Sequence, residues 1–278
     1  MMLHKFILTV TLPISFLIAG AAQAQEDAER LALYDALGLP AMFEIMQEEG
    51  VAYGEQIEID LFPERGGSDW EALVARIYDR DVMQSDVYNV LEEQLSEADI
   101  EAMLDFFTSD LGETIIGYEV AARRALLDDE IEAASEKAAA LAIADETPRY
   151  LQVRNYVEAN DLIETNIVGS MNSSYAFYMG LLDGGAFGQG LTEDQILSDV
   201  WSQEPDIRQS TTEWVYSFLL LAYQPLSDAD LDAYIAFSRS DAGQDLNAAL
   251  FVAFDGMFER ISRQLGLGAT RFMNGAEL

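Results

Sequence analysis

Cysteine is absent from this chain of 278 residues, and His4 is its only histidine. His4 lies in a segment that we expect to be removed, so the mature chain is expected to lack both residue types. Their absence excludes thiolate nucleophiles, Ser-His-Asp and Cys-His catalytic sets, and zinc sites built from imidazole or thiolate. Disulfides are excluded as well. The fold therefore has to be stable by burial alone, and a chain of this length can bury a core large enough for that.

Basic residues are also scarce, with 15 Lys and Arg against 50 Asp and Glu, and Lys5 and Lys137 are the only lysines. Such a surface repels phosphate backbones, so no nucleic-acid partner is expected, and anionic lipid headgroups are disfavoured for the same reason. A cationic partner, divalent metal ions and adaptation to a salty medium remain open as explanations of the charge. Since 50% of the residues are hydrophobic, the chain does not have the composition of a disordered acidic protein.

Long hydrophobic runs are missing except at the N-terminus, where residues 6–20 are almost uninterrupted in their apolar character. This run is shorter than the roughly 20 residues of a membrane-spanning helix, and Pro13 interrupts it. Lys5 precedes it, and Ala22-Gln23-Ala24 follows as a small-x-small cleavage signal. We expect a signal peptide at 1–24, an exported chain in the bacterial periplasm, and no membrane span after cleavage. An uncleaved anchor is the alternative.

One phrase occurs twice, as LSEADIEAMLDFFTSDLG at 95–112 and as LSDADLDAYIAFSRSDAG at 226–243. Nine of the eighteen positions are identical, and the second copy begins 131 residues after the first. At the same offset Trp70 corresponds to Trp201 and Gly38 to Gly169. The sequence therefore predicts an internal repeat, with unit 1 at 25–147 and unit 2 at 148–278.

Each phrase has the features of a capped helix start followed by a corner. A serine is placed as N-cap with an aspartate three residues later, and the flanking apolar residues are spaced for a hydrophobic staple. A second serine then caps a following, longer helix, and a glycine permits close contact at the corner. The residues in these roles are Leu95, Ser96, Asp99, Ile100, Phe106, Ser109 and Gly112 in the first copy, and Leu226, Ser227, Asp230, Leu231, Phe237, Ser240 and Gly243 in the second.

The remaining segments also have helical patterns. Pro40 and Pro148 are placed to open helices, Thr192 and Gln195 form a further capping-box pattern, and 213–224 is apolar on all sides, as in a central buried helix. No long period-2 alternation indicates a strand. The sequence predicts an all-α protein of two tandem, related helical units, each led by an αα-hairpin and packed together without a sheet.

The repeated phrase resembles the domain of unknown function 2059 family, whose members are exported bacterial helical domains. The resemblance covers the eighteen residues of each copy, and both copies depart from the family phrase at its proline, which Asp110 and Asp241 replace. It implies an all-helical exported domain, and it implies no activity, because the motif consists of helix-starting and core residues.

No catalytic, cofactor-binding or metal-binding residue is assigned from the sequence, and no cofactor is expected. We interpret the glycine-rich loop at 184–190 as structural, because it lacks a Walker lysine and because an EF-hand loop that begins at Asp183 would lack side-chain ligands. Three charged patterns are also interpreted as structural. They are the aspartates Asp228, Asp230 and Asp232, the acidic helix face of Asp128, Glu132 and Glu136, and the arginines Arg123, Arg124, Arg260 and Arg263. The aromatic residues Trp70, Tyr78, Trp201, Trp214, Tyr216 and Phe218 are assigned to core packing, with a lipid-sized groove as the alternative.

Three functions remain open. The first is a non-catalytic periplasmic interaction or envelope-maintenance module, with another periplasmic protein as partner. The second is a carrier of an apolar or lipid-like small molecule between the two helical halves. The third is a carboxylate-dependent hydrolase of envelope polymers, which would need two facing carboxylates, one of them with a raised pKa.

Overall fold

The computed structural model describes residues 28–95, 97–187, 190 and 192–275. The predicted signal peptide and the N-cap Ser96 lie outside these residues. The described part consists of helices and connecting turns, with no strand, so the predicted all-α class is confirmed. Residues 28–36 form the first helix, and the others are α2 (Leu39–Leu61), α3 (Gly67–Ile77), α4 (Arg80–Gln94), α5 (Glu97–Phe107), α6 (Asp110–Ala125), α7 (Asp129–Ala144), α8 (Pro148–Ala159), α9 (Leu162–Asp183), α10 (Glu193–Ser202), α11 (Glu204–Ala222), α12 (Asp228–Ser238) and α13 (Asp241–Met273).

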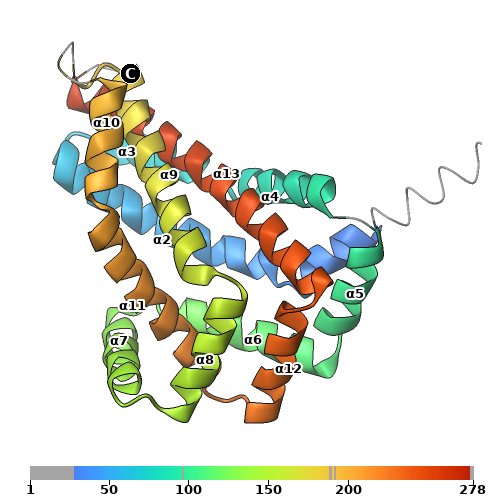
Figure 1. Cartoon of the computed structure of the whole chain (residues 1–278). Coiled ribbons are helices and arrows are strands. Elements are labelled where there is room, and N and C mark those ends of the chain that lie inside the picture. Colours follow the sequence, from blue (N-terminus) through green and yellow to red (C-terminus); the bar gives the residue numbers. More distant parts are fainter. Residues whose placement is uncertain (1–27, 96, 188–189, 191, 276–278) are drawn as a thin grey trace, which may run out of the picture.

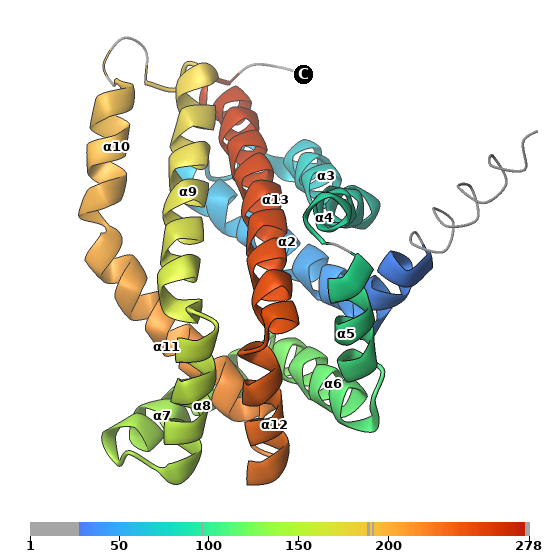
Figure 2. The same ribbon diagram turned by 45° about the vertical axis from the view of Figure 1, so that its right-hand side comes forward.

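α13 is the axis of the molecule, and α9 lies beside it in both views (Figures 1 and 2). Glycines allow the two backbones to approach: a Cβ added to Gly180 of α9 would overlap the carbonyl oxygen of Arg263, and one added to Gly266 of α13 would overlap that of Phe177. These two glycines therefore determine how closely the central helices pack. None of the described helices combines the length and the apolar character that a membrane crossing requires.

One large core joins the two predicted units. Besides α9, α13 contacts α2, α3, α4 and α5, while α11 packs against α6, α7, α8 and α9. At one end of the core, Trp70 and Phe62 of the first unit pack edge-to-face, and both contact Phe272 of α13, with ring centroids 5.0 to 5.5 Å apart. The units 25–147 and 148–278 therefore do not have separate cores, and their boundary stays a prediction.

The two copies of the repeated phrase end in the same local geometry. Ser109 accepts a hydrogen bond from the amide of Gly112 at 3.1 Å, and Ser240 accepts one from the amide of Gly243, also at 3.1 Å. A Cβ on either glycine would overlap the carbonyl oxygen of the phenylalanine six residues earlier, which explains why glycine stands at both corners. The four apolar residues placed for staples are all buried: Leu95, Ile100, Leu226 and Leu231.

Outside the phrase, the positions paired by the offset differ. Trp70 is 1% exposed in the core, whereas Trp201 is 61% exposed at the end of α10. Gly38 lies between two helices with a φ of 66°, whereas Gly169 lies within α9. The matches at these positions do not correspond to equivalent places in the fold, so a repeat that extends over the whole halves stays a prediction.

Candidate functional site

An open groove of about 780 Å³ runs along α13 and is the larger of two adjoining hollows. Residues 165–173 of α9 and 247–262 of α13 provide most of its lining, and Tyr53 of α2 and Tyr78 complete it. Aromatic and uncharged polar side chains both line the groove. The aromatic ones are Tyr53, Tyr78, Phe251, Phe254 and Phe258, and the uncharged polar ones are Thr165, Asn166, Ser170, Ser173, Asn247 and Ser262.

Asp255 is the single carboxylate among the described residues that line the groove. Asn172 of α9 donates a hydrogen bond to its Oδ2 atom at 3.0 Å. The Oδ1 atom is buried, and no described residue donates a hydrogen bond to it. A Cβ on Gly169 would come within 3.1 Å of Oδ1, so glycine leaves room for this acceptor on the facing helix.

A smaller pocket of about 220 Å³ adjoins the groove, because Asn247, Leu250 and Phe254 line both. This pocket lies between the two copies of the repeated phrase, where Phe107 of α5 and Phe237 of α12 are part of its wall. Its other aromatic residues are Tyr156, Tyr234 and Phe254, and its single carboxylate belongs to Glu119. No Lys or Arg is among the described residues that line it.

Glu119 of α6 lies within a cluster of tyrosines from the second half of the chain. The hydroxyl of Tyr223 donates to Glu119 Oε1 at 2.6 Å, and that of Tyr234 donates to the same oxygen at 3.3 Å. The hydroxyl of Tyr156 in turn donates to the hydroxyl of Tyr234 at 3.0 Å. The three tyrosines are buried, and Glu119 retains a partly accessible surface because it lines the pocket.

The surroundings raise the pKa of Glu119 to about 7. Burial is the main cause, since it disfavours the charged carboxylate, and the hydrogen bonds from Tyr223 and Tyr234 offset it only in part. The pKa values of both tyrosines are raised well above 10 by burial and by the neighbouring carboxylate, so both stay neutral near pH 7. Glu119 is therefore the group of this cluster whose charge changes close to neutral pH.

Sequence reasoning missed Glu119, although a signal was present. Ile115, Glu119 and Ala122 follow one another at helical spacing, and Ile115 and Ala122 are both buried. A carboxylate between two buried positions of one helix face is unusual and needs a partner. The tyrosine partners, however, come from distant helices, and no sequence spacing indicates them.

The six aromatic residues singled out from the sequence lie in different places. Trp70, Tyr78 and Tyr216 are buried in the core, and Tyr78 is the one that also lines the groove. Trp214 and Phe218 stack on α11 with centroids 5.4 Å apart, and Arg123 lies 4.7 Å above the Trp214 ring. The other aromatic residues of the groove are Tyr53 of α2 and Phe251, Phe254 and Phe258 of α13, which the sequence pattern did not distinguish from core residues.

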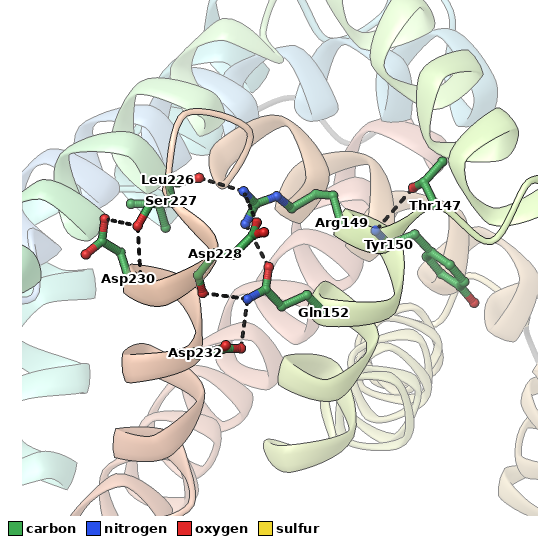
Figure 3. Close-up of polar contacts among 9 residues, drawn as sticks. All are labelled: Thr147, Arg149, Tyr150, Gln152, Leu226, Ser227, Asp228, Asp230 and Asp232. Carbon is green, nitrogen blue, oxygen red and sulfur yellow. Dashed lines mark hydrogen bonds and ion pairs between the residues drawn. The ribbon is translucent and has the colours of Figure 1, made fainter.

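Asp228 and Asp232 contact residues of α8, and Asp230 contacts Ser227 at the start of α12 (Figure 3). The hydroxyl of Ser227 accepts from the amide of Asp230 at 3.1 Å, as an N-cap does. Arg149 of α8 pairs with Asp228 at 3.1 Å, and Gln152 donates to Asp232 at 2.8 Å. The three aspartates thus point to different partners on and around the start of α12.

The other charged patterns also have partners within the fold. Asp128 is the N-cap of α7 and accepts from two backbone amides, while Glu132 is half-buried and Glu136 is exposed on the following turns of that helix. The four arginines pair with acids of other helices: Arg123 with Glu49, Arg124 with Glu44 and Glu48, Arg260 with Asp86, and Arg263 with Asp183. Among the described residues, no group of three or more acidic or histidine side chains is arranged to hold a metal ion.

The segment that contains Glu119 is similar to a known protein family. Residues 81–140 match a family described as "Uncharacterized protein conserved in bacteria (DUF2059)". The resemblance is confirmed over these residues, which include the first copy of the phrase. The match does not extend to 226–243, so the second copy stays a prediction. No curated protein and no solved structure gave a significant match.

Proposed function

We propose that the chain is a non-catalytic binding protein that holds an apolar or amphipathic small molecule in the groove between α9 and α13. The observation that supports this is the groove itself, whose volume of about 780 Å³ falls within the roughly 300–1,000 Å³ typical of small-molecule sites. Aromatic side chains provide apolar contact area there, and the asparagines and serines of both walls offer hydrogen bonds that fix an orientation.

A test uses a neutral dye whose fluorescence rises on transfer to apolar surroundings. Val168 and Val252 lie on opposite walls of the groove and are 55% and 52% exposed, so Asp at either position places a charge in the groove at little cost in stability. We expect Val168→Asp and Val252→Asp to weaken dye binding several-fold. Leu141→Asp on α7, at a position 58% exposed, is the matched control and should leave dye binding unchanged.

Native mass spectrometry of the protein purified from its own host provides an independent measurement. We expect an added mass that disappears after delipidation and returns when the extract is added back. Bare protein in every preparation, together with dye binding that the two groove variants do not alter, would reject the proposal.

We propose further that the binding protein works in the bacterial periplasm. This rests on the sequence of the first 24 residues, with the cut between Ala24 and Gln25. Fractionation of cells that express the whole chain, with N-terminal sequencing of the product, tests it. A mature N-terminus at Gln25 in the periplasmic fraction is expected, and a product that keeps residues 1–24 in the membrane fraction would contradict it.

A second candidate is the interaction module, because α10 presents an apolar surface. Trp201 and Leu197 are 61% and 46% exposed on this helix, whose buried side packs on α9 through Ile196 and Val200. Exposed aromatic residues are frequent anchors of protein–protein contacts. Crosslinking from a photoreactive residue at 201 in living cells tests this, and the absence of any crosslinked product would count against it.

A carboxylate-dependent hydrolase has less support. Among the residues that the structure describes, each hollow is lined by a single carboxylate, Asp255 in the groove and Glu119 in the smaller pocket. The general acid and the second carboxylate of a glycosidase have to flank one scissile bond. Neither hollow brings two carboxylates to its own lining.

A further inference from the structure

We propose that the pocket at Glu119 binds the ammonium group of an organic cation, whose apolar part extends into the adjoining groove. The proposal rests on the proposed binding function and names the class of ligand: an amphipathic amine or quaternary ammonium compound. Three features of the described residues support it: a carboxylate without a cationic partner, an aromatic wall, and a larger groove, lined in part by aromatic residues, that adjoins the pocket.

The carboxylate lacks a cationic partner within the fold. Glu119 accepts hydrogen bonds from Tyr223 and Tyr234, and it forms no ion pair with any described Lys or Arg. A partly buried carboxylate without a counter-charge costs free energy, and a cation that enters the pocket would offset this cost. The arginines of the surrounding helices are engaged elsewhere, as the pairs of Arg123 with Glu49 and of Arg260 with Asp86 show.

The wall of the pocket favours an organic cation over a metal ion. Phe107, Tyr156, Tyr234, Phe237 and Phe254 all line it. The faces of aromatic rings attract ammonium groups, and rings grouped around a quaternary ammonium are a known mode of recognition. Calcium and magnesium instead need several oxygen ligands, whereas this pocket offers one carboxylate.

The sizes of the two hollows fit a molecule with a head and a tail. At about 220 Å³ the pocket is smaller than a typical site for a whole drug-sized ligand, and the groove at about 780 Å³ is several times larger. Asn247, Leu250 and Phe254 line both, so the two hollows meet along one stripe of α13, and the proposal places the head group on one side of these residues and the tail on the other. The formal net charge of −35 attracts cations and repels anions at long range, and so it also favours a cationic ligand.

The titration of the pocket gives the proposal a second, independent readout. The titratable groups around Glu119 are Tyr156 of α8, Tyr223 after α11 and Tyr234 of α12, and burial raises the pKa of each above its usual value of 10. Among the described lining residues, those of α2, α5 and α13 carry no charged side chain. An ammonium group favours the ionised form of Glu119, so binding should release a proton below about pH 7 and become tighter as pH rises towards 8.

The test is isothermal titration calorimetry of the mature chain with two pairs of compounds. Dodecyltrimethylammonium is compared with an uncharged dodecyl ether, both below their micelle concentrations. Choline is compared with 3,3-dimethylbutanol, which has the same shape without the charge. We expect the cation of each pair to bind about tenfold or more tightly, because a desolvated cation–aromatic contact and a carboxylate both act on it.

Glu119→Gln should abolish the preference for the cation, whereas Glu113→Gln should retain it. Glu113 is exposed on the same helix, so this control removes one charge without altering the pocket. The preference should also persist at about 0.5 M NaCl, since screening weakens surface attraction far more than contacts within a pocket.

The outcomes separate this proposal from the binding function. If the dodecyl ether binds as tightly as the ammonium compound, or if Glu119→Gln keeps the preference, the assignment of the head group is wrong while groove binding stands. If neither dodecyl compound binds, both proposals fail. If Glu119→Gln does not fold, the unchanged protein is titrated with dodecyltrimethylammonium in buffers of different ionisation enthalpy, which measures the protons released on binding. Binding near pH 6 without release of a proton would overturn the proposal.

Discussion

Phe106 of α5 and Phe237 of α12 stack on each other, with ring centroids 4.2 Å apart and planes inclined by 12°. The two residues occupy the same position of the repeated phrase, 131 residues apart. A residue that contacts its own counterpart is the arrangement expected beside a two-fold axis. The contact therefore joins the two copies directly, and Phe237 also lines the pocket that contains Glu119.

The stacked pair should show coupling in a double-mutant cycle. Phe106→Leu and Phe237→Leu each remove a ring, and the offset-stacked contact accounts for about 0.5–1.5 kcal/mol beyond the area buried. We expect the double variant to be less destabilised than the sum of the single variants by that amount, measured by urea unfolding. Phe106→Leu combined with Phe62→Leu, whose ring contacts are Trp70 and Phe272, should be additive within about 0.5 kcal/mol.

The glycines of the central helices should respond to alanine in opposite directions. A methyl group on Gly266 would overlap the carbonyl oxygen of Phe177, so Gly266→Ala should separate α9 from α13 and cost about 1–3 kcal/mol or more. Gly256 lies in the same helix and a Cβ there would meet nothing within 4 Å. Gly256→Ala should therefore stabilise the protein by about 0.5–1 kcal/mol, as glycine replacement in a helix normally does.

Thermal and urea unfolding of both variants give the comparison. Equal stabilisation by the two substitutions would mean that the backbones of α9 and α13 are not in close contact at Gly266.

The serine at the start of α13 should contribute to stability as an N-cap. Ser240 accepts a hydrogen bond from the amide of Gly243, so Ser240→Ala leaves that amide without its partner and should cost about 1 kcal/mol. Ser210 on α11 bonds only to a backbone carbonyl of its own helix, and Ser210→Ala should change stability by less than about 0.5 kcal/mol. Similar urea midpoints for the two variants would contradict the assigned cap.

Helix starts were the part of the fold that the sequence predicted best, because their signals are local. Pro40 and Pro148 lie in the first turns of α2 and α8, and Thr192 with Gln195 forms the capping box of α10. Of segment 213–224, predicted as a central buried helix, residues 213–222 belong to α11, whose neighbours are helices of both halves. Each of these depends on residues within a few positions of one another.

The candidate site could not be predicted, because it depends on distant contacts. Glu119 is one of 50 acidic residues, and its partners Tyr223 and Tyr234 are more than a hundred positions away. Trp201 was expected to correspond to Trp70, yet it is exposed, because Val200 beside it takes the buried place against α9. Sequence spacing alone does not distinguish these environments.

Glu119 should make the stability of the protein fall as pH rises from about 4.5 to about 7. Its pKa is raised from 4.5 to about 7, so between these values the folded chain holds a proton that the unfolded chain has lost. The folded state binds more protons in this range, so a rise in pH destabilises it relative to the unfolded state. The loss of stability begins at about pH 4.5 and is complete above pH 7.

Glu119→Gln should remove that dependence, because an amide can still accept the hydrogen bond from Tyr223 and does not ionise. Relative to the unchanged protein, the variant should gain stability from pH 5 to pH 8, by about 2–3 kcal/mol at the upper end. Urea unfolding at several pH values measures the difference, and Glu113→Gln on the same helix corrects for the loss of one negative charge. A difference that stays constant across this range would show that Glu119 is ionised throughout, and would place its carboxylate in contact with solvent rather than within the tyrosine cluster.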